Sequence, residues 1–229
     1  MRIKGDINMT TLIKTSPVAY AHQTMQAQIG MHHGMEVALS FEGNEVEEMH
    51  KKILAVTDVS CFARFGIKGP KAADWLNQQG IKTPDLINAW VEGAPNTLVL
   101  RLGGSEFLVE DQAQGNACEG LRAFDQANTP CAYQVARNDA AFILGGHEVL
   151  NLLSELCTLD LRNSALPSHG LVMTQIAGIS ATLIRESLGG EQVYRIWCDG
   201  TYGSYLWEVL IEIAQELGGG AVGLICRFQ

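Results

Sequence analysis

The sequence predicts an α+β protein made of two similar lobes with mainly antiparallel sheets. A strand followed by a helix occurs twice, and each copy is followed by a hairpin and a second helix. These two pseudo-repeats extend over about residues 60–128 and 138–217. An apolar share of 47% in 229 residues is enough for one sizeable core or for two lobes that share a core.

Each repeat begins with a strand and a helix. Residues 62–70 alternate between polar and apolar types, and Pro70 suits the first position of the following helix. Residues 140–146 form the corresponding apolar strand, and residues 149–156 have apolar side chains at helical spacing. Both segments therefore predict a strand that leads directly into a helix.

Each repeat continues with a hairpin, because glycine pairs supply the positive φ angles that tight turns require. The predicted hairpin strands are 98–102 with 106–110, around Gly103–Gly104, and 179–185 with 192–198, around Gly189–Gly190. Predicted helices lie at 22–28, 45–54, 118–127 and 202–217. We expect residues 1–15 to be an N-terminal extension and residues 16–229 to form the body of the protein.

Charge and apolar pattern exclude several classes of protein. The chain has 16 Lys+Arg against 25 Asp+Glu, a net charge of −9, which argues against nucleic-acid binding. No apolar run approaches the roughly 20 residues that span a membrane, and the N-terminus does not resemble a signal peptide. We therefore expect a cytoplasmic protein. The six cysteines include no C-x-x-C pair, which predicts reduced and mostly buried thiols.

The motifs that usually carry chemistry are not convincing here. Residues 218–223 match G-x-G-x-x-G, but a helix precedes them and few residues follow, so a helix stop and a short last strand are the better interpretation. No H-E-x-x-H or G-x-S-x-G motif occurs. Asp58 precedes Ser60–Cys61, where it is expected to cap a buried turn. These residues alone indicate no catalytic group and no metal site.

Several segments together resemble a known family. Residues 34–41 (G-M-E-V-A-L-S-F), 51–70 and 185–197 (R-E-S-L-G-G-E-Q-V-Y-R-I-W) resemble segments of the tetrahydrofolate-dependent aminomethyltransferase of the glycine cleavage system, the T-protein. Residues 156–161, 165–167 and 205–207 resemble a relative of the T-protein, the gamma subunit of heterotetrameric sarcosine oxidase. The resemblance extends from about residue 16 to the C-terminus.

This resemblance implies a fold, a cofactor and a set of site residues. The fold would be two ferredoxin-like lobes around a folate channel, without the C-terminal barrel of the full T-protein. Tetrahydrofolate would be the cofactor, with Glu191, Arg185, Asn96 and Phe41 as binding residues. Glu191 matches the family glutamate that contacts the pterin ring, although a solvated hairpin residue is an equal alternative. Phe41 would stack on a flat ring, but an aromatic residue in this setting is more often part of the core.

One departure from the family decides the expected function. The T-protein has an aspartate pair before the strand that corresponds to residues 98–101, whereas this chain has Pro95–Asn96–Thr97. Asn96 cannot stabilise a cationic iminium as a carboxylate does. The resemblance thus implies a noncatalytic gamma-like subunit, whose partners are the other subunits of a flavin-dependent N-methyl amino acid oxidase. The alternatives are a stand-alone folate-dependent aminomethyltransferase or folate-binding module, and a purely structural member of the fold.

Overall fold

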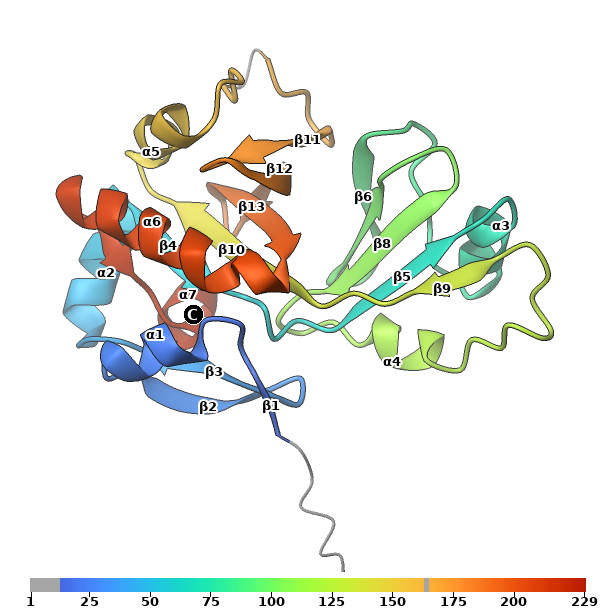
Figure 1. Ribbon diagram of the computed structural model, residues 1–229, viewed down its shortest axis with the longest axis horizontal. Coiled ribbons are helices and arrows are strands. Elements are labelled where there is room, and N and C mark those ends of the chain that lie inside the picture. Colours follow the sequence, from blue (N-terminus) through green and yellow to red (C-terminus); the bar gives the residue numbers. More distant parts are fainter. Residues whose placement is uncertain (1–12, 163–164) are drawn as a thin grey trace, which may run out of the picture.

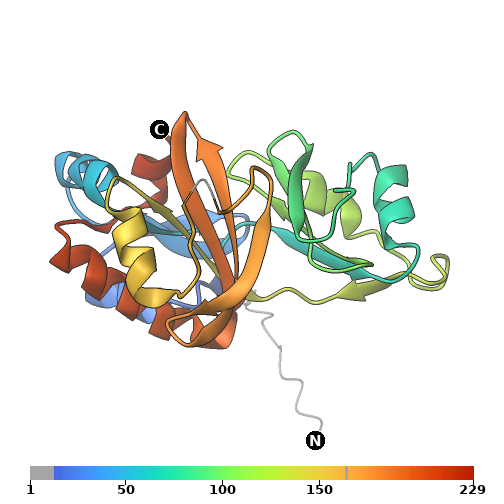
Figure 2. The same cartoon turned by 90° about the horizontal axis from the view of Figure 1, so that it is seen from above.

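The computed structural model describes residues 13–162 and 165–229, in which three sheets are arranged as two halves that lie side by side (Figures 1 and 2). The five-stranded sheet has the order β6 (Ala89–Ala94), β7 (Thr97–Arg101), β8 (Glu106–Asp111), β5 (Arg64–Lys68) and β9 (Tyr133–Val135). The six-stranded sheet has the order β11 (Leu171–Ile176), β12 (Ile179–Leu188), β13 (Glu191–Asp199), β10 (Asp139–Gly145), β4 (Ala55–Asp58) and β14 (Gly220–Ala221).

A third, smaller sheet and the helices complete the molecule. The small sheet has the order β1 (Lys14–Thr15), β3 (Met35–Ser40) and β2 (Gln28–His32). The helices are α1 (Ala19–Thr24), α2 (Asn44–Ile53), α3 (Ala72–Gln78), α4 (Ala117–Leu121), α5 (Val149–Leu156), α6 (Gly203–Glu216) and α7 (Leu224–Phe228), with a short 3-10 helix at Gly200–Tyr202.

The two large sheets share one topology, which confirms the predicted fold class. In one sheet the neighbouring strands β9, β5, β8 and β7 are antiparallel, and in the other β4, β10, β13 and β12 are antiparallel in the corresponding places. Within each set, a strand–helix–hairpin order along the chain produces this arrangement, as in a ferredoxin-like lobe. The second lobe departs in one respect, because β4 comes from upstream and β14 pairs beside it in parallel.

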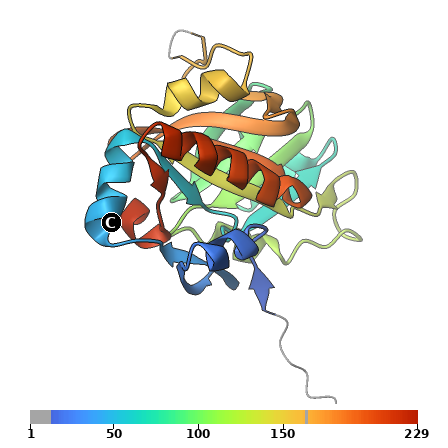
Figure 3. The same ribbon diagram turned by 60° about the vertical axis from the view of Figure 1, so that its left-hand side comes forward.

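Three apolar clusters hold these layers together. Helices α5 and α6 cover one face of the six-stranded sheet, as Figure 3 shows, and Trp207 of α6 is buried there. Helices α3 and α4 cover the outer face of the five-stranded sheet. The third cluster fills the space between the two sheets, with Leu100 and Leu108 from one and Ile143 and Val193 from the other.

The boundaries of some predicted elements are wrong. The helix expected at 22–28 is α1, which ends at Thr24; Gln26 has a φ of 55°, and Gln28 begins β2. A positive φ cannot continue a right-handed helix, and the chain turns into the small sheet instead. The helix expected at 118–127 ends at Leu121. Residues 1–12 of the expected extension lie outside the described residues.

Other sequence interpretations are confirmed. Gly218 has a φ of +84° just after α6, and the short strand β14 follows, so the glycine-rich run is a helix stop. All six cysteines are free thiols, and Cys131 alone is exposed. In the part of the chain that the structure describes, no helix is both long enough and apolar enough to cross a membrane.

Candidate functional site

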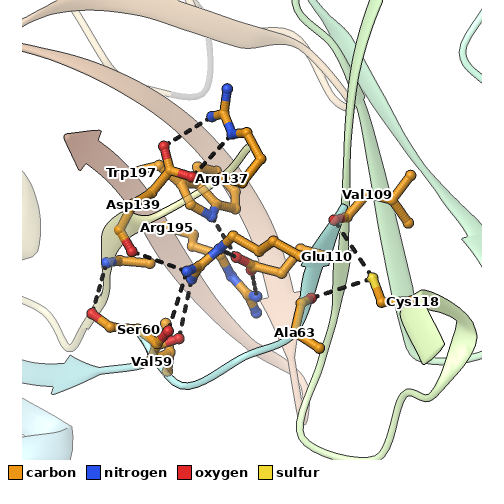
Figure 4. A network of polar contacts seen from close by, with 12 residues as sticks. Val59, Ser60, Ala63, Val109, Glu110, Cys118, Arg137, Asp139, Arg195 and Trp197 are labelled. Carbon is orange, nitrogen blue, oxygen red and sulfur yellow. Dashed lines mark hydrogen bonds and ion pairs between the residues drawn. The ribbon is translucent and has the colours of Figure 1, made fainter. Parts of the chain in front are cut away.

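A polar network lies inside the apolar layer between the two large sheets (Figure 4). We call it the inter-sheet network, and its members are Arg64, Glu110, Glu186, Arg195 and Trp197. Arg64 and Glu110 come from the five-stranded sheet, and the other three come from β12 and β13 of the six-stranded sheet. The network therefore joins the two lobes directly.

Strand alternation explains how these charged residues reach the interior. Successive residues of a strand point to opposite faces, so Arg195 shares a face with Val193 and Trp197. Val193 is paired across the sheet with Glu186, which brings that carboxylate to the same face. Arg195 and Glu186 thus project between the sheets because of their positions in an otherwise apolar hairpin.

Glu110 is the centre of the network and has no exposed surface. It accepts hydrogen bonds from Nη1 of Arg195 at 2.6 Å, from Nε1 of Trp197 at 2.6 Å and from Nε of Arg64. Burial works to raise the pKa of Glu110, but the charges of Arg64 and Arg195 outweigh it and hold the pKa below the usual value. Glu110 is therefore an ionised structural anchor between the lobes.

Glu186 shares Arg195 with Glu110 but is held less strongly. Its Oε1 accepts from Nε of Arg195 at 2.7 Å, and its Oε2 accepts from Nε2 of Gln112 at 3.3 Å. Burial raises the pKa of Glu186, and the attraction of Arg195 only partly offsets this effect. Arg195 also lies over the ring of Phe62, 5.6 Å from its centroid. Glu110 and Glu186 both accept from Arg195, yet their pKa values are shifted in opposite directions.

A second ion pair lies at the end of the sheet where β13 begins. We call Glu191 and Arg227 the rim pair: Nη1 of Arg227 donates to Oε2 of Glu191 at 2.8 Å. The Arg227 side chain is 1% exposed, whereas that of Glu191 is 33% exposed. Gly145 leaves room for the pair, because a Cβ there would lie 2.5 Å from Oε1 of Glu191 and 2.6 Å from Nη2 of Arg227. Among the described residues, Glu191 Oε1 and Arg227 Nε have no hydrogen-bond partner.

The other residues that the resemblance singled out lie elsewhere. Arg185 is paired with Tyr194 and interacts with it on the helix-covered face, opposite to the face of Glu191. Phe41 stacks on Trp207 at 5.8 Å between ring centroids, in agreement with the core interpretation. Asn96 is exposed in the turn after β6, with a φ of 53°. The structure does not bring the four residues into one cavity.

Asn96 nevertheless has an indirect connection to the network. Its carbonyl oxygen accepts from the backbone N–H of Gln112 at 2.8 Å, and the Gln112 side chain donates to Glu186. Asn96 is thus linked to Glu186 only through Gln112, whereas Arg185 and Phe41 lie on the helix-covered side of the six-stranded sheet. Asp58 caps its turn as expected, accepting from the backbone N–H and the hydroxyl of Ser60.

Sequence reasoning missed the network and Arg227. One signal was present: Arg195 interrupts the apolar face of a strand between Val193 and Trp197. A charged residue there must find a partner, because burying an unpaired charge is costly. No signal in the sequence indicates the identity of that partner, since Glu110 is 85 residues away.

The inter-sheet network holds the two lobes together through buried ion pairs. Burial raises the pKa of the thiols of Cys61 and Cys118, so neither is a ready nucleophile. Among the described residues, no group of three His, Cys, Asp or Glu side chains could hold a metal ion. A pterin presents two parallel N–H donors to a carboxylate, but Arg227 already donates to Glu191. In this arrangement the rim pair therefore does not fit a pterin.

Comparison with known proteins now defines the class. The model of the family described as the GCVT N-terminal domain matches residues 94–228, more than half of the chain, so the chain belongs to this family. No curated protein sequence matches the chain significantly.

Two solved structures share the fold. The glycine cleavage system aminomethyltransferase T from Bartonella henselae aligns with a TM-score of 0.70 and 19% identity, over 94% of this chain but 61% of that one. A chain of the heterotetrameric sarcosine oxidase from Corynebacterium sp. U-96, in complex with pyrrole 2-carboxylate, aligns with a TM-score of 0.65 and 19% identity. That alignment covers 90% of this chain and 97% of the oxidase chain.

Proposed function

We propose that this chain is a noncatalytic subunit of a flavin-dependent oxidase of N-methyl amino acids, resembling the gamma subunit of heterotetrameric sarcosine oxidase. Its role would be to support a partner subunit in which the methyl-derived carbon is transferred to tetrahydrofolate. The alignment with a sarcosine oxidase chain, which covers 90% of this chain and 97% of that one, supports this assignment. Asn96 supports it as well, since an amide cannot supply a negative charge to a cationic intermediate.

The rim pair is the observation that carries the proposal. By resemblance, Glu191 is the carboxylate that would bind the pterin, and Arg227 of the same chain donates to it at 2.8 Å. The guanidinium offers the same kind of donor as the guanidine-like edge of a pterin, so both compete for one carboxylate. A chain that satisfies this carboxylate internally is suited to a supporting role.

A second candidate, a folate-binding module, is favoured by one feature of the same pair. Glu191 is one-third exposed and borders an open cavity of about 400 Å³, which Lys52 and His147 also line. Its Oε1 has no partner among the described residues. If Arg227 moved away, both carboxylate oxygens would become available.

Co-expression tests the proposed subunit role. The full chain would be produced together with each flavin-oxidase subunit encoded beside it, and the purified material would be examined by size-exclusion chromatography with light scattering. We expect a stoichiometric complex in which oxidase activity survives Glu191→Gln in this chain. A chain that stays separate from every such subunit would overturn the proposal.

Thermal unfolding with tetrahydrofolate separates the two candidates. A ligand at about 100 times its Kd adds roughly 2.7 kcal/mol to the stability of its binding protein. The noncatalytic proposal predicts no stabilisation of the wild-type chain at millimolar tetrahydrofolate. Stabilisation that Glu191→Gln abolishes and Arg227→Gln enhances would instead establish the folate-binding module.

A further inference from the structure

A small pocket lies at the opposite end of β10 from the rim pair. Gly145, beside Glu191, ends this strand, whereas Asp139, which begins it, lines the pocket. Lys14 of β1 and Arg122, just after α4, come to the same place from other parts of the chain. The pocket therefore forms where elements of all three sheets meet.

Two of the cations that line this pocket already have partners. Arg137 donates from Nε and Nη2 to the two carboxylate oxygens of Asp139, at 3.0 and 2.9 Å. Arg64 donates to Glu110, and its Nη1 also donates to the carbonyl oxygen of Asp139 at 3.0 Å. Their charges are thus largely neutralised within the protein.

The other two cations of the pocket are not neutralised. Within residues 13–162 and 165–229, the side chains of Lys14 and Arg122 have no hydrogen bond or ion pair. Asp139 is the one acidic residue among the described residues that line the pocket, and its carboxylate is already paired with Arg137. A chain with a net charge of −9 thus has a local excess of positive charge at a concave site.

The size and walls of the pocket restrict what it can hold. Its volume is about 240 Å³, below the roughly 300 Å³ at which pockets for drug-sized ligands begin. Pro17, Met35 and Phe62 provide apolar wall, and Lys14 and Arg122 provide charge. A short carbon chain that ends in a carboxylate matches both features, whereas a ligand as large as a folate does not.

We propose that this pocket binds a carboxylate, with Arg122 and Lys14 as the residues that recognise it. Guanidinium groups bind carboxylates through charge-assisted hydrogen bonds, and the ammonium of Lys14 adds a second positive charge. The carboxylate belongs either to a free small dicarboxylic acid or to an acidic side chain of a protein that docks here. The site is independent of Glu191 and of the proposed subunit role.

Isothermal titration of the full chain with succinate, and separately with the capped peptide acetyl-Gly-Asp-Glu-Gly-amide, tests the site. We expect saturable binding of at least one probe that weakens about ten-fold in Arg122→Gln and in Lys14→Gln. Lys82→Gln is the matched control, because Lys82 is exposed, carries the same charge and lies outside the pocket. Arg122 and Lys14 are exposed, so their substitution leaves the fold intact.

Each outcome has a definite meaning. Binding of succinate with the expected variant effects identifies a site for a free small acid, and binding of the peptide alone identifies a site for an acidic protein side chain. Absence of saturable binding by both probes at tens of millimolar overturns the proposal. A loss of affinity in Lys82→Gln equal to that in Arg122→Gln overturns it too, because the binding would then reflect overall charge.

Discussion

Glu110 lies between the two large sheets, whereas Glu191 lies at the end of the six-stranded sheet where β13 begins, and their surroundings differ. Glu110 has no exposed surface and accepts from three donors, two of them arginines. Glu191 is one-third exposed, and among the described residues it accepts from Arg227 alone. The comparison shows that the same residue type is fully buried and held by three donors at one place, and is partly exposed with one donor at another.

This difference bears on function because an anchor and a binding site have opposite requirements. A carboxylate that is buried between two lobes needs hydrogen-bond donors for its oxygens. A carboxylate that binds a ligand must keep some capacity free, and Glu191 retains an unpartnered oxygen among the described residues. The family resemblance placed a ligand at Glu191, and the structure shows one internal donor at that place.

We expect Glu110→Gln to lower the free energy of unfolding more than Arg227→Gln or Glu186→Gln does. The amide lacks the negative charge, so Arg64 and Arg195 would remain buried without their shared counter-ion. Breaking a buried ion pair in this way costs about 3–5 kcal/mol. Urea denaturation at pH 7 should therefore show a fall of that size in the free energy of unfolding.

Glu155→Gln provides the control for this measurement. Glu155 is exposed in α5 and has no ion pair among the described residues, so its substitution should change the stability by less than about 0.5 kcal/mol. If Glu110→Gln lowered the free energy of unfolding by less than about 1 kcal/mol, Glu110 would not be an anchor between the lobes.

Arg227→Gln, which breaks the rim pair, should lower the free energy of unfolding less than Glu110→Gln does. The charge removed is buried, but the carboxylate left behind is partly exposed and can be solvated. We expect a loss of about 1–2 kcal/mol in the free energy of unfolding, below that of Glu110→Gln. Arg162→Gln, which removes an exposed pair with Asp160, should leave the free energy of unfolding nearly unchanged, because water screens that pair. If Arg227→Gln lowered the free energy of unfolding as much as Glu110→Gln does, the distinction between Glu110 and Glu191 would be wrong.

The fold could be predicted from the sequence because its signals are local. Alternation around the glycine pairs located the hairpin strands of both lobes, and apolar spacing located α5 and α6. The end of α1 could not be predicted in this way. Gln26 has a positive φ because the chain turns into β2 there, and glutamine is not a residue type that signals such a turn. The expectation of two ferredoxin-like lobes followed from the family resemblance.

The candidate site was only partly predictable. Arg185 and Glu191 were expected to act together, but the register of the hairpin puts Arg185 opposite Tyr194 and on the other face from Glu191. That outcome follows from a two-residue turn at Gly189–Gly190 and was accessible to sequence reasoning. The Glu110–Arg195 pair was not, because it depends on how two separate sheets pack.

Glu186→Gln should have the smallest effect, and its sign should oppose that of Glu110→Gln. Because burial raises the pKa of Glu186, the folded chain holds this proton more tightly than the unfolded chain. Its contribution therefore favours folding below the unfolded pKa and is lost as the pH rises through the folded pKa.

Glutamine removes this pH-dependent cost and can still accept from Nε of Arg195. We expect the free energy of unfolding of Glu186→Gln at pH 7 to equal or exceed that of the wild type, by less than about 1 kcal/mol. Urea denaturation from pH 4.5 upward should show a shallower decline with pH in the variant. A destabilisation as large as that of Arg227→Gln would mean that Arg195 requires both carboxylates, and that Glu110 alone does not anchor the lobes.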